Sequence, residues 1–162
     1  MRVSHGRWRW LATALAGVLL LIASGCSKSD DSSSITATTI FVQKFRYNGV
    51  PSSVPAGINT FLFQNRESFP ITHEMIPIAI PTGKTAQDVI DGAKANGPSD
   101  EDNWLHIGGD FGAADTGAGV VETLNLPPGT YAFACWQTGT QSGGENGPPH
   151  ASIGMVATFT VA

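Results

Sequence analysis

The stretch from Gly129 to Met155 constrains the fold more than any other part of the sequence. Two prolines directly before it predict a turn at Gly129, and the stretch begins with an alternating strand, Gly-Thr-Tyr-Ala-Phe-Ala-Cys, that ends at Cys135. Because side chains alternate between the two faces of a strand, Tyr131, Phe133 and Cys135 share one face. The two aromatic side chains predict that this face is turned toward a hydrophobic core. We therefore expect the thiol of Cys135 to be buried.

Similar strand-like runs, separated by turns, make up most of the remaining chain. The runs are rich in β-branched and aromatic residues, and the glycine, proline and asparagine residues between them predict turns. These runs cover residues 35–47, 58–65, 72–80, 120–126 and 153–161. Short strands punctuated by turns, about seven to eight in all, predict an all-β protein with a Greek-key β-sandwich.

Residues 81–119 interrupt this pattern. Thr85 and Asp88 have the spacing of a capping box at the start of a helix. The pair Gly97-Pro98 predicts where that helix ends. The segment after it is rich in glycine and acidic residues. We therefore expect a short helix and a long loop inserted at about 81–119 and lying over the sandwich. His106, within this insertion, is expected to pack over one end of the sandwich or to lie in solvent.

The N-terminal residues have the pattern of a secretory leader. Three arginines precede an apolar run, residues 11–23, that is too short to span a bilayer comfortably. The run ends in Ala-Ser-Gly directly before Cys26, which resembles the lipobox of bacterial lipoproteins. The sequence predicts a signal peptide at 1–25, a lipidated Cys26 with a flexible polar linker over 26–34, and one folded domain at 35–162. An ordinary signal peptide cleaved nearby is the alternative.

Removal of this leader makes the chain more acidic. Three of the 9 Lys and Arg residues lie in the leader, which leaves 6 against 13 acidic residues and a formal net charge of −7. The sequence holds no basic cluster, so nothing in it supports nucleic-acid binding. The predicted location is the cell envelope, with the domain lipid-anchored to a membrane on the extracytoplasmic (periplasmic or extracellular) side.

Four side chains have the character of metal ligands. Cys135 is the only cysteine of the expected domain, and an exposed thiol outside the cytoplasm is a liability unless it is buried or bound to a metal. His150 and Met155 follow it, and His73 begins an apolar run far upstream. One thiolate, two imidazoles and a thioether are the donors of a mononuclear blue-copper centre. The alternative is a buried core cysteine and methionine with two unrelated histidines.

These residues resemble the cupredoxin family, which includes plastocyanin, azurin and the copper domains of nitrite reductases. The resemblance covers the chain from about residue 38 onward, and its most specific part is Pro-Gly-Thr-Tyr-x-Phe-x-Cys followed by His-x₄-Met. It implies a cupredoxin-like sandwich and one copper held in a type 1 site by His73, Cys135, His150 and Met155. It also implies electron transfer between redox partner proteins. The alternatives are a metal-free cupredoxin-like binding module and a copper storage or delivery protein.

Catalysis on a substrate is not expected. Cys135 and His150 together suggest a nucleophile and base, but the expected domain carries no recognisable nucleophile motif and the thiol is expected to be buried. A copper enzyme of this family would need further histidine clusters such as His-x-His, and the sequence contains none.

The sequence departs from the family pattern at two places. Fourteen residues separate Cys135 from His150, more than in many members of the family, so sequence spacing alone does not place the two side chains together. In addition, Glu74 follows His73 where the family usually has asparagine, whose side chain ties the ligand loops together. We expect Glu74 to make some of the same hydrogen bonds while adding a negative charge near the metal.

Overall fold

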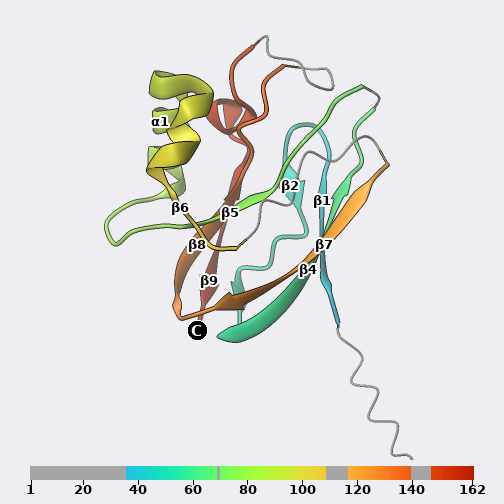
Figure 1. Ribbon diagram of the computed structural model, residues 1–162, viewed down its shortest axis with the longest axis vertical. Coiled ribbons are helices and arrows are strands. Elements are labelled where there is room, and N and C mark those ends of the chain that lie inside the picture. Colours follow the sequence, from blue (N-terminus) through green and yellow to red (C-terminus); the bar gives the residue numbers. More distant parts are fainter. Residues whose placement is uncertain (1–35, 69, 109–116, 140–146) are drawn as a thin grey trace, which may run out of the picture. The chain divides into compact units, whose positions relative to one another are not determined.

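Two β-sheets form the body of the structure, a computed structural model that describes residues 36–68, 70–108, 117–139 and 147–162 (Figure 1). One sheet has the strand order β2-β1-β4-β7 and the other the order β3-β9-β8-β5-β6. The strands of the first sheet are β1 (Thr38–Val42), β2 (Tyr47–Asn48), β4 (Gly57–Asn65) and β7 (Gly119–Leu126). Those of the second are β3 (Ser53–Val54), β5 (Ile76–Ala79), β6 (Leu105–His106), β8 (Gly129–Ala134) and β9 (Val156–Val161).

The chain passes between the two sheets instead of completing one before starting the other. β4 runs parallel to β1 and antiparallel to β7, whereas β5, which follows β4 in sequence, pairs with β8 in the second sheet. β8 in turn pairs with β9 in antiparallel register. The β-sandwich with one inserted helix, predicted from the sequence, is therefore confirmed.

The first predicted strand, residues 35–47, is divided in two. β1 ends at Val42 and β2 begins at Tyr47, because Lys44 and Phe45 between them have positive φ angles of 56° and 55°. Residues other than glycine rarely adopt this left-handed conformation, which turns the chain out of the strand. The prediction of one continuous strand here was wrong.

Aromatic side chains fill the core between the sheets. Phe61 of β4 meets Phe133 of β8 edge to face at a centroid distance of 5.4 Å, and Phe133 stacks on Phe159 of β9 at 4.9 Å. Tyr131, Phe133 and Cys135 all belong to this core, as the alternation in the sequence predicted. The alternate residues of β8 instead face the opposite side of the second sheet, where a smaller cluster lies.

The insertion covers that opposite side. α1 (Ala86–Asn96) begins with the predicted capping box, ends at Gly97 with a φ of 67°, and continues into the 3-10 helix η1 (Gly97–Asn103). Val89 and Ala93 of α1 are buried against β5 and β8. Figure 1 shows α1 beside a second 3-10 helix, η2 (His150–Ile153), which α1 contacts directly.

Two residues of the predicted long loop form a short edge strand, β6. β6 pairs with β5, and His106 in β6 is exposed, with its Nε2 3.7 Å from a carboxylate oxygen of Glu101. Residues 109–116 of the predicted insertion lie outside the described residues, as do the predicted signal peptide at 1–25, Cys26 and the linker at 26–34. Within the part of the chain that the structure describes, no helix is both long and apolar enough to cross a membrane.

Candidate metal centre

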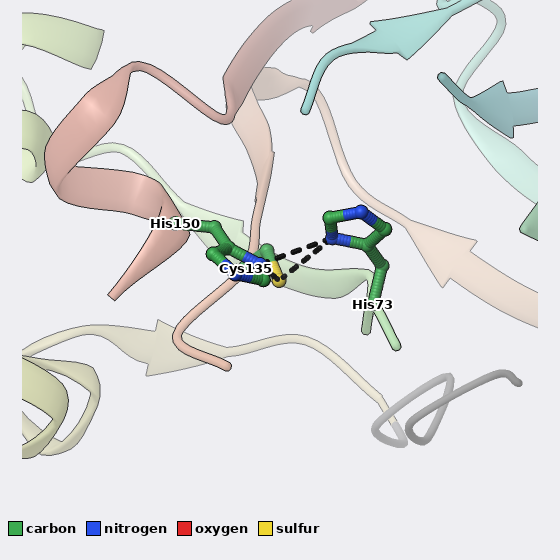
Figure 2. Close-up of side chains that lie close together, drawn as sticks. All are labelled: His73, Cys135 and His150. Carbon is green, nitrogen blue, oxygen red and sulfur yellow. Dashed lines mark hydrogen bonds between the residues drawn. The ribbon is translucent and has the colours of Figure 1, made fainter. Parts of the chain in front are cut away.

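Three of the predicted ligands, His73, Cys135 and His150, lie together in the protein interior (Figure 2). The Nδ1 atoms of the two histidines are 3.0 Å apart, and the Sγ atom of Cys135 is 3.4 Å from Nδ1 of His150 and 3.9 Å from Nδ1 of His73. His73 and Cys135 have no exposed surface, and His150 is 2% exposed. One sulfur and two nitrogens therefore face a single buried point.

The spacing of these atoms is compatible with a shared metal ion. A first-row metal with bonds of about 2.0 Å to nitrogen and about 2.3 Å to sulfur, in a trigonal plane, would separate the nitrogens by about 3.5 Å and each nitrogen from sulfur by about 3.7 Å. The three observed distances lie within about 0.5 Å of these values. A thiolate with two imidazoles is the in-plane donor set of a blue-copper site.

The fourteen-residue loop after Cys135 brings His150 back because its two ends pair with each other. The N–H of Ala151 donates to the carbonyl of Cys135 at 2.6 Å, and the N–H of His150 donates to the carbonyl of Gln137 at 2.9 Å. An isolated β-bridge links the next residues outward on each side. Residues 140–146 of the loop lie outside the described residues, and the paired ends place His150 beside Cys135.

A backbone carbonyl fixes which nitrogen of His150 is protonated. Nε2 of His150 lies 2.7 Å from the carbonyl oxygen of Gly139. Because a carbonyl only accepts hydrogen bonds, Nε2 carries the proton, and Nδ1 keeps its lone pair toward Cys135 in the neutral ring. Burial lowers the pKa of His150, which favours this neutral form. Gly147, with a φ of 123°, packs against Gly139, where an added Cβ would lie 3.3 Å from the Gly139 backbone.

His73 is also held in the neutral form. Burial, together with the repulsion that would arise if His150 were protonated as well, lowers the pKa of His73 to about 3. Its Nδ1 faces Cys135, and its Nε2 points to the other side, 3.6 Å from Oε1 of Glu67. Neutral imidazole is the form that binds a metal, so both rings are suitable ligands at neutral pH.

Glu74 joins the two ligand-bearing segments, as expected from its place after His73. One carboxylate oxygen accepts the backbone N–H of Trp136 at 2.6 Å, and the other accepts the side-chain amide of Gln137 at 3.0 Å. The Glu74 carbonyl accepts the hydroxyl of Tyr47 at 2.6 Å. The residue after His73 thus bonds to the residues directly after the cysteine, and this connection fixes the two segments relative to each other.

Met155 lies in the same core cluster as Cys135. Its side chain is fully buried, and its backbone N–H donates to the carbonyl of His150 at 3.0 Å. The residue before it, Gly154, has a φ of 98°, which directs the chain from η2 into β9. Its role as the axial ligand stays a prediction.

Phe45 is a residue of the site that the sequence did not reveal. Its half-buried ring lies edge-on to both imidazoles, with centroid distances of 5.1 Å to His73 and 4.8 Å to His150. The positive φ of Phe45 directs this ring to the site. The available sequence signal was weak: Gln43, Lys44 and Arg46 interrupt the apolar pattern around it.

No protein-family model matches the chain, and no curated protein sequence matches it. Solved structures do match. An auracyanin from the photosynthetic bacterium Roseiflexus castenholzii, reduced with dithionite, superposes with a TM-score of 0.53 and 24% identity over 78% of this chain and 98% of the auracyanin. Auracyanin B gives a TM-score of 0.51 and 20% identity over 78% of this chain and 88% of its own length. Auracyanins are cupredoxins. The two-sheet architecture and these superpositions together show that the chain has the cupredoxin fold.

Proposed function

We propose that the protein carries one copper ion in a type 1 (blue) site and transfers single electrons between redox partner proteins. His73, Cys135 and His150 are the in-plane ligands and Met155 is the weak axial ligand. The observation that carries the proposal is the approach of Nδ1, Nδ1 and Sγ to one buried point. Among the described residues this is the only group of three or more His, Cys, Asp and Glu side chains placed to hold a metal, which supports one copper per domain.

Bound copper would supply a Cu(II)/Cu(I) couple, which accepts one electron from a reduced partner and returns it to an oxidised one without a change in covalent bonds. The protein contributes a fixed set of donors. The carbonyl of Gly139 orients His150, and Glu74 connects the His73 segment to the cysteine loop. Donors held by such contacts move little when the charge of the metal changes, which favours rapid electron transfer. The burial of all three donors excludes water from the metal.

The test is to add Cu(II) to the metal-free protein and measure the bound copper and the visible absorption spectrum. We expect one copper per chain and an intense blue thiolate-to-Cu(II) band, which Cys135→Ala abolishes. Colour that survives this substitution would contradict the assignment of the site. Absence of copper would favour the metal-free binding module, and tight binding of colourless Cu(I) without reversible oxidation would favour storage or delivery. We assign no catalytic reaction to the protein.

We also propose that the domain is a lipoprotein held at a membrane outside the cytoplasm. The supporting pattern is the apolar run that ends at Cys26, followed by a linker rich in serine and aspartate over 26–34. In this proposal residues 1–25 are removed and the domain at 35–162 is tethered by the lipid on Cys26. Mass spectrometry of the mature N-terminus should find a lipidated Cys26, and Cys26→Ala should move the protein from the membrane to the soluble fraction.

A further inference from the structure

The carboxylate of Glu67 faces the side of His73 that points away from Cys135. Oε1 of Glu67 lies 3.6 Å from Nε2 of His73, and the Glu67 side chain is only 10% exposed. His73 is fully buried, and its Nε2 has no hydrogen-bond partner among the described residues. The distance is longer than a hydrogen bond, so the contact is an electrostatic attraction between the carboxylate and the imidazole N–H. No other acceptor reaches this nitrogen in the part of the chain that the structure describes.

The position of Glu67 is fixed by the backbone. Its Oε1 atom accepts the N–H of Phe45 at 2.7 Å, and its own N–H donates to Oδ1 of Asn65 at 3.0 Å. The side-chain amide of Asn65 in turn donates to the carbonyl of Ile71, two residues before His73. The same carboxylate therefore holds the left-handed turn that places the Phe45 ring against both imidazoles. Such strained turns persist where surrounding contacts hold them.

The proton of His73 has two possible places. On Nδ1 it would be shared with Nδ1 of His150, 3.0 Å away, and would block the point that the donors face. On Nε2 it lies next to Glu67 and leaves the Nδ1 lone pair open to a metal. Carboxylates that accept a hydrogen bond from this ring nitrogen commonly fix metal-binding histidines, and their removal typically weakens metal binding 10- to 100-fold. Here the same pair of groups interacts over 3.6 Å, by electrostatic attraction.

We propose that Glu67 is a positioning residue of the metal site, which keeps the His73 proton on Nε2 and whose negative charge favours the oxidised metal over the reduced one. The positioning part rests on the geometry of Glu67, Phe45 and His73. The part that concerns oxidation rests on the proposed function. By favouring the oxidised metal, the negative charge of Glu67 lowers the reduction potential at which the protein exchanges electrons.

Two substitutions separate these roles. Glu67→Gln removes the charge but keeps an oxygen that can accept the Phe45 N–H and face Nε2 of His73, so we expect Zn(II) affinity within a few-fold of wild type. The ratio of reduced to oxidised copper protein at a fixed potential should rise on the order of tenfold, about 59 mV for a one-electron couple. Glu67→Leu removes charge and acceptor together and should weaken Zn(II) binding about 10- to 100-fold.

Asp91→Asn is the matched control, because it makes the same change of charge at a side chain of α1 that is 62% exposed. It should alter neither Zn(II) affinity nor the potential, since solvent screens exposed charges. A folded Glu67→Leu protein that binds Zn(II) like wild type would overturn the positioning role. A Glu67→Gln protein with the potential of the control would overturn the electrostatic role. A wild-type protein that binds Zn(II) but has no copper redox couple would contradict the proposed function, and the Zn(II) comparison would then decide the role of Glu67.

Discussion

Replacing Glu74 by alanine removes the carboxylate that joins the two ligand-bearing segments. The buried N–H of Trp136 loses a 2.6 Å bond to a charged acceptor, and the half-buried amide of Gln137 loses a 3.0 Å bond. A hydrogen bond to a charged group contributes about 1.5–3 kcal/mol when buried, and the second, wetter bond contributes about 1 kcal/mol. Because alanine carries no charge, the free-energy cost of burying the Glu74 carboxylate disappears, which offsets part of this loss. We expect the free energy of unfolding to fall by about 3 kcal/mol.

Urea unfolding of the metal-free protein measures this change directly. With a slope of about 1–3 kcal/mol per molar urea, the midpoint should move down by at least about 1 M. Glu74→Gln keeps one oxygen for the Trp136 N–H and should lose about half as much. Glu101→Ala, at a side chain that is 32% exposed, is the control and should change stability by less than about 1 kcal/mol. A Glu74→Ala protein as stable as this control would refute the role of the carboxylate as the link between the segments.

Three further predictions follow from the same structure. Burial lowers the pKa of His73 to about 3 and also lowers the pKa of His150, whereas histidines of the unfolded chain protonate near pH 6.5. The free energy of unfolding of the metal-free protein should therefore decrease as the pH falls from about 6.5 toward 3, by at most about 1.4 kcal/mol per pH unit for each histidine. A free energy of unfolding that stays constant in urea titrations over this range would contradict the prediction. Gly92→Ala places a Cβ 2.6 Å from Oδ1 of buried Asp100. Thermal unfolding should therefore show a free energy of unfolding about 1–3 kcal/mol lower than that of wild type, and a higher value would argue against the close contact. In the copper protein, Met155→Leu should raise the reduction potential and leave copper binding near wild type, and lost binding would show that the thioether is more than a weak axial ligand.

Two carboxylates, Glu67 and Glu74, flank the candidate site and have different roles. Glu74 bonds to the backbone after the cysteine and therefore acts mainly on the stability of the frame. Glu67 faces an imidazole nitrogen and therefore acts mainly on the ligand itself. The stability measurements on Glu74 and the metal measurements on Glu67 thus test separate consequences of buried negative charge.

The features that the sequence determined are those that depend on neighbouring residues. The period of two placed Tyr131, Phe133 and Cys135 on one core face, because successive side chains of a strand must alternate. The capping box started α1 at the predicted place, since its hydrogen bonds join residues three apart. The donor types of the candidate metal site could be predicted for a similar reason, because a cysteine, two histidines and a methionine have the same ligand chemistry in any fold.

Only the tertiary structure decided which distant residues meet. The turn at Lys44 and Phe45 is held by a carboxylate 22 residues away from Phe45, and no local pattern encodes that bond. The loop after Cys135 reaches His150 because its ends pair as a ribbon, which spacing alone does not predict. A contact between distant residues forms when the packing of the whole sandwich offsets the entropy of closing the chain between them. For that reason the sequence named the candidate ligands, and the fold decided how closely His73, Cys135 and His150 approach one another and what surrounds them.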